Sequence, residues 1–452
     1  MTHLTLDITN VLSKTIGDEG IDRVLLGNVA SKINRFKKTV YDTPYPFMDF
    51  SLLRSHLKDV NRVAEDLKKT KINNLILLGI GGSSLGTETI FHALLDPLHN
   101  LKKERKNNAP RYFILDNIDP SRIKQLADLA KAERKETLLI VISKSGETPE
   151  TMSQFMVFKD ILSIDKDYKK RIVIVTDKNK GMLREIAKRE GYPSLPVPEG
   201  IGGRFSVLTP VGMLPASIMG IDIKKILDGA EEMSKHIEEA YYRKNLAVVI
   251  ASILYLMDKK GKPMHVMMPY CERLNAFADW FRQLEAESLG KKGRGPTPLK
   301  STGVTDQHSQ LQLYIDGPKD KCITFLYSVD ECLPIPDSFS YIEELNYLAG
   351  KDMKALFHAE FLGTRRSLTD AKIPNITITL DEISPFNIGA LFFLYEMVIA
   401  FMGFLYEVNA FDQPAVELGK IYTKAIMGKK GLEEKGRIIE KELKGKRVLI
   451  EF

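Results

Sequence analysis

Two short segments of glycine and hydroxyl residues hold the side chains best suited to grip an anion. Gly79–Gly86 reads GIGGSSLG and Ser143–Thr151 reads SKSGETPET, and each directly follows an apolar run. Glycines let the backbone turn sharply and bring N–H groups against an anion. In the second segment three hydroxyls and Lys144 fall within six positions, and Pro149 suits the first position of a helix. Because a helix N-terminus favours negative charge, the pair predicts a phosphate-binding site.

Neither segment matches the better-known nucleotide-binding loops. A Walker loop ends in Gly-Lys-Ser/Thr, whereas Gly82 is followed by Ser-Ser-Leu at 83–85. The dinucleotide fingerprint G-x-G-x-x-G is not matched either, and we find no acidic strand end suited to a ribose. A nucleoside triphosphate is therefore not expected. Either segment alone could be an ordinary connection from a strand to a helix, but two in tandem favour the phosphate site.

Four further segments gather polar groups in short windows: IGGRFSVLTPVG at 201–212, QLEAESLGKKG at 283–293, STGVTDQHSQ at 301–310 and FDQPAVELGK at 411–420. Within them Arg204 could place a guanidinium in a cleft and Glu287 could act as a base. His308 could shuttle a proton, and Lys420 could supply a cation. Taken singly, three of these residues also fit a purely structural interpretation: Glu287 as a solvated glutamate on a helix, His308 as a structural histidine and Lys420 as a surface lysine.

The bulk composition fits a mildly basic soluble enzyme with an anionic substrate. The chain has 452 residues, with 65 Lys and Arg against 59 Asp and Glu, and a net charge of +6. This charge is too dilute to predict a nucleic-acid partner. A chain of this length exceeds the usual limit of one hydrophobic core, so two packed domains are expected.

Cysteine and histidine spacing predicts neither disulfides nor a metal site. Cys271, Cys322 and Cys332 form no CxxC pair and no even set, so we interpret them as reduced core residues of a cytoplasmic protein. The eight histidines never fall in HxxxH or HExxH spacing. The N-terminus has no basic region followed by an apolar core and does not resemble a signal peptide. Chemistry without metal or cofactor is the expectation.

One segment is nearly apolar enough to cross a membrane. Gly389–Tyr406 reads GALFFLYEMVIAFMGFLY and holds Glu396 near its middle. A charge at that depth costs about 3 kcal/mol on insertion scales. Since no second such segment exists, we expect a buried helix of a large α/β core and no membrane partner.

From Asn74 onward apolar strands alternate with helices. Strands are predicted at 74–80, 111–117, 137–142 and 171–177, and helices at 87–95, 120–132, 149–162 and 181–190. Continuous apolar strands separated by helices predict a parallel sheet covered on both faces. A ligand should bind at the carboxyl ends of its strands, where both glycine and hydroxyl segments fall.

A second alternation follows a helical stretch at 223–257. Strands are predicted at 263–270, 322–329 and 375–380, and helices at 274–289, 342–360 and 387–409. The predicted class is α/β, with two αβα sandwich domains of parallel-rich sheets and a C-terminal helical segment. We assign residues 1–222, which include an N-terminal helical extension, to the first domain, 223–428 to the second and 429–452 to a charged surface tail. The second domain could be a diverged duplicate of the first, although no repeat of letters is visible.

Taken together, the six segments resemble the phosphoglucose isomerase family in the right order over nearly the whole chain. GIGGSSLG resembles its first sugar-phosphate loop, SKSGETPET its second, GGRFS its arginine motif, ES-x-GK its glutamate motif, QH its histidine motif and DQ-x-A-VE-x-GK its C-terminal signature. The resemblance implies a pair of sugar-isomerase (SIS-type) domains. It also implies aldose-ketose isomerisation of glucose 6-phosphate and fructose 6-phosphate through a cis-enediolate, a reaction of glycolysis and gluconeogenesis.

The resemblance also implies residue roles. Glu287 matches the base that moves a proton between C2 and C1, and Arg204 would offset the charge of the enediolate. His308 and Lys420 match groups that assist opening of the sugar ring. The remaining matched positions would contact the phosphate or the sugar: Gly82, Ser83, Ser143, Lys144, Ser145, Thr148, Gln283 and Gln413.

These roles suit the chemistry, because a proton next to a carbonyl needs a positioned base and positive charge near the developing oxyanion. A histidine that titrates near neutrality suits ring opening. In the family the histidine comes from the neighbouring subunit, which implies a homodimer.

The chain departs from the pattern at Pro414 and Ala415, where long eukaryotic-type members tend to carry Trp-Gly, and it resembles the compact bacterial branch. Two alternatives stay open: an isomerase that also accepts mannose 6-phosphate, and a non-catalytic SIS module that senses a sugar phosphate.

Overall fold

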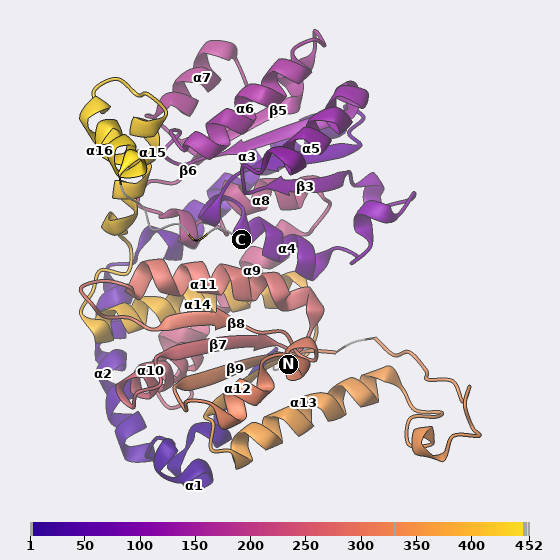
Figure 1. Ribbon diagram of the computed structural model, residues 1–452, viewed down its shortest axis with the longest axis vertical. Helices are drawn as coiled ribbons and strands as arrows, with labels where there is room; N and C mark the ends of the chain where they lie inside the picture. Colours follow the sequence, from indigo (N-terminus) through magenta and orange to yellow (C-terminus); the bar gives the residue numbers. More distant parts are fainter. Residues whose placement is uncertain (1–2, 330, 446–449, 451–452) are drawn as a thin grey trace. The chain divides into compact units, whose positions relative to one another are not determined.

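The computed structural model describes residues 3–329, 331–445 and 450. The chain separates into two compact units, residues 1–410 and residues 411–452. The first unit contains both β-sheets and most of the helices (Figure 1). The second contains two helices, and each unit is described by itself.

The first sheet is wholly parallel, as the strand and helix alternation predicts. Its strands lie in the order β3-β2-β4-β5-β6, with bounds β2 Asn74–Leu78, β3 Arg111–Leu115, β4 Thr137–Ile142, β5 Ile172–Asp177 and β6 Ser194–Val197. The intervening helices are α4 Leu85–Leu94, α5 Pro120–Ala132, α6 Pro149–Leu162 and α7 Met182–Glu190. Every residue of β2 and β4 is buried, and the side chains of one face pack against α5, α6 and α7.

The second sheet is parallel except at one edge. Its order is β1-β10-β9-β7-β8, with bounds β1 Leu4–Asp7, β7 Met264–Pro269, β8 Thr297–Lys300, β9 Lys321–Tyr327 and β10 Asn375–Leu380. Strand β1 pairs with β10 in the antiparallel direction. The sequence pattern does not predict strands β1, β6 and β8, because each has four residues and lies at a sheet edge. Two of them also contain a proline, which edge strands tolerate.

The helical stretch predicted at 223–257 is two helices, α9 Ile223–Glu239 and α10 Leu246–Lys259. The buried side chain of Asn245 causes the break. Its amide donates to the carbonyl of Ile237, and its oxygen accepts from the N–H of Val248 as the cap of α10.

The helix predicted at 342–360 is wrong in its first half. Helix α13 runs from Met353 to Asp370, and Asp352 starts it by accepting the N–H of Lys354 at 2.7 Å. Before it, residues 331–352 extend away from the second sheet (Figure 1). Local capping, which a helical pattern of apolar residues does not reveal, decides where this helix begins.

The long apolar helix α14, Pro385–Tyr406, is confirmed as a buried helix. Among the described residues it alone is long and apolar enough to span a membrane, yet 94% of its apolar window is buried inside the protein. It packs closely on α9, since a Cβ on Gly389 would lie 1.8 Å from the carbonyl oxygen of Ile226. Burial raises the pKa of Glu396 well above its ordinary value, because a charged carboxylate is poorly solvated in the core.

The other helices of the first unit are α1 Ser13–Ile16, α2 Arg23–Asp42, α3 Phe50–Lys68, α8 Pro210–Ile218, α11 Asn275–Leu289 and α12 Leu311–Asp316. The second unit contains α15 Glu417–Ile426 and α16 Glu433–Lys444. Within that unit Ile438 and Leu443 are 56% and 55% exposed, as a surface helix requires. Residues 446–449 and 451–452 of the predicted tail lie outside the described residues.

The two sheets share one topology. The order β3-β2-β4-β5 repeats as β8-β7-β9-β10, because in each sheet the chain first forms an inner strand (β2 or β7), then its neighbour on one side, then two strands on the other. This is what a diverged internal duplicate would produce.

Candidate active site

The two phosphate-loop candidates lie at the switch point of the first sheet. GIGGSSLG follows β2 and SKSGETPET follows β4, and these strands are neighbours from which the chain leaves in opposite directions. In open α/β sheets, ligands bind in the crevice that such strands create at their carboxyl ends. The topology therefore brings the two segments together at the carboxyl ends of β2 and β4.

The loop after β4 is ordered around a buried serine. Ser143 is 2% exposed, and its hydroxyl lies 3.1 Å from that of Thr148 while accepting the N–H of Gly146 at 3.1 Å. Gly146 has φ +67°, a backbone conformation that favours glycine. Thr148 is the N-cap residue of α6, but its side chain makes no capping hydrogen bond. The first N–H groups of α6 are therefore not satisfied by a side chain at the N-cap, as an anion site requires.

A cavity of about 550 Å³ opens beside this loop. It is lined by Lys144, Ser145, Glu147, Asp177, Lys180 and Gly181. The ammonium of Lys144 donates to the carbonyl of Ile201 at 2.7 Å, and burial lowers the pKa of Lys144. Ser145 accepts the N–H of Glu147 at 3.3 Å. The cavity lining thus holds one hydroxyl, two lysines and two carboxylates, while Ser143, Thr148 and the start of α6 belong to the same loop but do not line the cavity.

The first loop positions the arginine motif through direct contact between two backbones. A Cβ on Gly82 would lie 2.2 Å from the carbonyl carbon of Gly203 and 2.5 Å from the nitrogen of Arg204. Only glycine fits at Gly82 without displacing that backbone. The hydroxyl of Ser206 also donates to the carbonyl of Gly203 at 2.6 Å. Ser83 ends the short 3-10 turn Gly81–Ser83, which forms one side of this contact.

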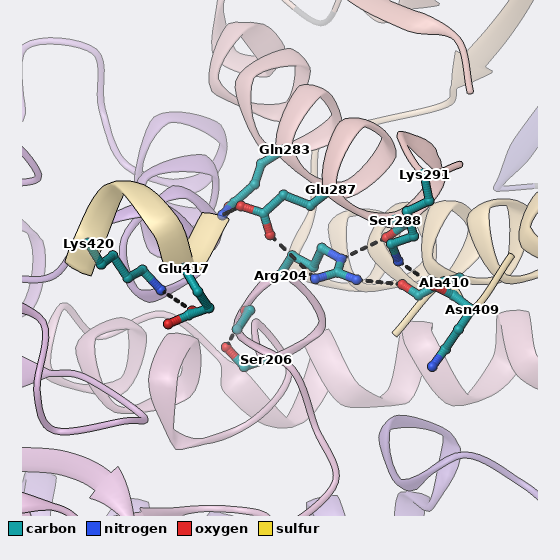
Figure 2. A network of polar contacts seen from close by, with 11 residues as sticks. Arg204, Ser206, Gln283, Glu287, Ser288, Lys291, Asn409, Ala410, Glu417 and Lys420 are labelled. Carbon is teal, nitrogen blue, oxygen red and sulfur yellow. Dashed lines mark hydrogen bonds and ion pairs between the residues drawn. The ribbon is translucent and has the colours of Figure 1, made fainter. Parts of the chain in front are cut away.

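Arg204 is the centre of a polar network that Figure 2 shows from close by. Its guanidinium is buried and donates to the hydroxyl of Ser288 at 2.7 Å and the carbonyl of Ala410 at 2.5 Å. A third nitrogen lies 3.4 Å from a carboxylate oxygen of Glu287. These contacts fix the plane of the guanidinium next to the carboxylate.

Helix α11 presents the carboxylate and an amide on one face. Gln283 and Glu287 are one turn apart, and the amide of Gln283 donates to Glu287 at 3.0 Å. The same amide lies against the first loop, since a Cβ on Gly81 would lie 2.7 Å from it. The side chain of Glu287 stays 26% exposed. A partly open carboxylate beside a buried cation can accept a proton while the cation balances negative charge on a bound molecule.

The structure does not bring His308 into this network. His308 ends the 3-10 turn Thr305–His308 and is exposed, and within the described residues it makes no hydrogen bond or ion pair with Glu287. Its neighbour Gln307 is anchored, accepting from the hydroxyl of Tyr270 and donating to Glu360 at 2.8 Å.

Lys420 and Gln413 belong to the second unit. Lys420 lies on α15 and donates to Glu417 at 2.8 Å, and this hydrogen bond lowers the pKa of Glu417. Gln413 precedes the 3-10 turn Pro414–Val416.

Sequence reasoning missed two partners of Arg204. Ser288 directly follows Glu287 within the glutamate motif, so its position there was a usable signal. The carbonyl of Ala410 carried none, because any residue presents a carbonyl. Within the described residues no three histidine, cysteine, aspartate or glutamate side chains are grouped as metal ligands.

The fold is that of a class of sugar-phosphate isomerase structures. A hypothetical protein from Thermus thermophilus superposes with a TM-score of 0.83, at 32% identity, covering 94% of this chain and 100% of that one. A glucose-6-phosphate isomerase from Chlamydia trachomatis shares the fold, with a TM-score of 0.80 at 21% identity, covering 98% of this chain and 92% of that one.

The sequence narrows the class to one family. The phosphoglucose isomerase family model matches residues 57–329 and 343–441. A glucose-6-phosphate isomerase from Rubrobacter xylanophilus is 39% identical, covering 95% of this chain and 99% of the relative. One from Carboxydothermus hydrogenoformans is 39% identical, covering 88% of each. The chain belongs to the phosphoglucose isomerase family, and the resemblance read from its six segments is confirmed.

Proposed function

We propose that this protein is an enzyme that interconverts glucose 6-phosphate and fructose 6-phosphate, a reaction of glycolysis and gluconeogenesis. One observation supports this above the others: the carboxylate of Glu287 lies 3.4 Å from the buried guanidinium of Arg204. Relatives named glucose-6-phosphate isomerase match most of the chain. A base and a cation at one point are what isomerisation through an enediolate needs.

In the proposed mechanism the phosphate binds the loop after β4. The hydroxyls of Ser143, Ser145 and Thr148 and the N-terminus of α6 hold its oxygens, with Lys144, Gly82 and Ser83 lining the same edge. Glu287 takes the proton from C2 of the open aldose and returns it to C1, so one carboxylate serves both carbons. Arg204 balances the negative charge that develops on the enediolate oxygen.

Gln283 orients Glu287 in this scheme, because its amide donates to the carboxylate at 3.0 Å. Gln413 contacts the sugar, and Lys420 and His308 assist ring opening before the proton transfer. A histidine can deliver a proton to the ring oxygen near neutral pH.

We further propose a homodimer in which His308 acts in the active site of the partner. The exposed position of His308 and the absence of a contact with Glu287 within the described residues support this. The segment 331–352 carries exposed apolar side chains: Leu333 at 62%, Phe339 at 54%, Tyr341 at 80% and Tyr347 at 68%. Such a row on an extended segment suits contact with a second copy. A fully active protein with the mass of a monomer would refute the dimer.

The protein would act in the cytoplasm, which fits three cysteines that form no disulfide among the described residues. The prediction that all three lie in the core is wrong for Cys332, which is exposed. We also propose that residues 1–222 and 223–428 act as two SIS-type domains, with 429–452 as a tail. Assays with glucose 6-phosphate, fructose 6-phosphate and mannose 6-phosphate test the substrate, and failure to convert fructose 6-phosphate would end the proposal.

The sharpest test of the mechanism is Glu287→Gln. The amide keeps the size of the side chain but cannot accept the proton, so kcat should fall by about a hundredfold or more, with KM changing little. Glu232→Gln, at an exposed position on α9, is the matched control and should keep full activity. A near-normal kcat for Glu287→Gln would show that the base lies elsewhere.

A further inference from the structure

We propose that a cleft at the amino ends of the strands of the first sheet binds a small polyanion carrying two or more phosphate groups. The cleft has a volume of about 970 Å³ and lies between the end of α3, the loop 103–108 and the connection from α8 to α9. Asn73 and Pro110, which line it, directly precede β2 and β3. It therefore sits at the amino ends of the strands, away from the loops that follow their carboxyl ends.

The charge of the cleft is strongly one-sided. Its cationic side chains are Lys68, Lys71, Lys103, Arg105 and Lys224. Asp222 is the only carboxylate among the described residues that line it, and it is engaged as the cap of α9, accepting the N–H of Lys225 at 3.0 Å. A cleft lined by charges of one sign focuses its field and concentrates ions of the other sign.

The lysines of the cleft lack partners that their sequence neighbours have. Within the described residues Lys68 and Lys103 make no ion pair or hydrogen bond through their side chains. Lys69 and Lys102, next to them but outside the cleft, pair with Asp66 and Asp96. The cations that face the cleft are thus left available to a bound anion.

The remaining cations of the cleft are also uncompensated or weakly paired. The side chain of Lys224 makes no ion pair within the described residues. Within the described residues the guanidinium of Arg105 donates to the main-chain carbonyls of Ala109 and Lys102, both at 2.7 Å, and it pairs with no carboxylate. Lys71 lies 3.9 Å from Glu136 with 77% of its side chain exposed, a pair that contributes little.

The walls of the cleft are held in place by direct contacts. Gly220, in the connection from α8 to α9, has φ +77°, and a Cβ there would lie 2.9 Å from the amide nitrogen of Asn107. Ser217 donates to Asn61 of α3 at 3.4 Å. The volume falls within the range of about 300–1,000 Å³ that small-molecule sites occupy. Several cations spread over such a space match a compact polyphosphate better than a single phosphate.

The test is calorimetric titration of the full chain with inorganic tripolyphosphate and, separately, with orthophosphate. We expect saturable binding of tripolyphosphate, weakened by added salt, and at least about tenfold weaker binding of orthophosphate. The double variant Lys103→Glu/Lys224→Glu should weaken tripolyphosphate binding by about tenfold or more. The double variant Lys124→Glu/Lys188→Glu changes the net charge equally at exposed helix positions outside the cleft, and it should bind normally.

Three results would overturn the proposal. One is no saturable binding of tripolyphosphate to the folded protein. Another is equal binding by Lys103→Glu/Lys224→Glu and the unaltered chain, which would assign the anion to the phosphate loop of the active site. The third is an equal loss in Lys124→Glu/Lys188→Glu, which would make the effect one of net charge. The circular dichroism spectrum and the urea unfolding curve of each variant, expected to match those of the unaltered chain, report that the protein is folded and keep this test independent of the proposed function.

Discussion

The two sheets of the first unit share one strand order but differ at the loop that follows the central strand. After β4 the chain reaches α6 through residues 143–148, whereas after the equivalent strand β9 it reaches α13 through residues 328–352. Each loop begins with a serine that is 2% exposed, Ser143 or Ser328. The hydroxyl of Ser143 bonds within its loop, while that of Ser328 has no hydrogen-bond partner among the described residues.

The N-cap residues of α6 and α13 also differ in whether they use a backbone N–H group. Asp352 puts a carboxylate on the N–H of Lys354 at the start of α13, whereas Thr148 makes no capping hydrogen bond on α6. A carboxylate at the N-cap uses an N–H group and repels an anion. An anion site therefore depends on which N–H groups the N-cap residue leaves available, even where the topology is shared.

Exchanging the caps is the strongest test of this contrast. Thr148→Asp should raise KM for fructose 6-phosphate by about a hundredfold, because a carboxylate would lie within a few ångströms of the phosphate. The free energy of unfolding should stay the same or rise by about 0.5 kcal/mol, since aspartate is a good N-cap. Steady-state kinetics and urea unfolding measure both. Asp352→Thr is the control and should leave KM unchanged; an unaltered KM for Thr148→Asp would refute the role of α6.

Two glycines test whether the close backbone contact in the site is needed: Gly82 in the loop after β2 and Gly363 in α13. Gly82→Ala should lower the free energy of unfolding by about 2 kcal/mol and reduce kcat, because its Cβ meets the backbone of Gly203 and displaces Arg204. Gly363→Ala in α13 meets nothing within 4 Å and should stabilise the protein by about 0.5–1 kcal/mol. Urea unfolding of both variants gives the comparison. Similar stabilities would mean that the contact of Gly82 with Gly203 is not needed.

Substitution of the two equivalent serines, Ser143 and Ser328, should produce the smallest difference in KM, with the larger KM for the Ser143 variant. Ser143→Ala removes a hydroxyl proposed to bind the phosphate and should raise KM by about tenfold, as expected for one hydrogen bond to a charged group. Ser328→Ala removes a hydroxyl of equal burial without a partner and should leave KM unchanged. Kinetics with fructose 6-phosphate decide the matter. Equal changes in both variants would mean that the two loops are not functionally distinct.

Much of the fold could be predicted from the sequence where an element is long and apolar. Strands β4 and β10 and helices α5 and α6 begin and end as the pattern predicts. The four-residue edge strands and the start of α13 could not be predicted. Edge strands carry too few buried side chains to show a period, and a cap depends on one side chain and the backbone it meets.

The sequence by itself determined the family and the residue types of the site, because GIGGSSLG, SKSGETPET, GGRFS and ES-x-GK are local patterns whose chemistry can be read from letters. Only the tertiary structure decided that Arg204 lies between Glu287, Ser288 and the carbonyl of Ala410. It also decided that Gly82 sits on Gly203 and that unpaired lysines from α3, α9 and the loop 103–108 share one cleft. Contacts between residues distant in the chain arise from the packing of whole elements, which no local pattern specifies.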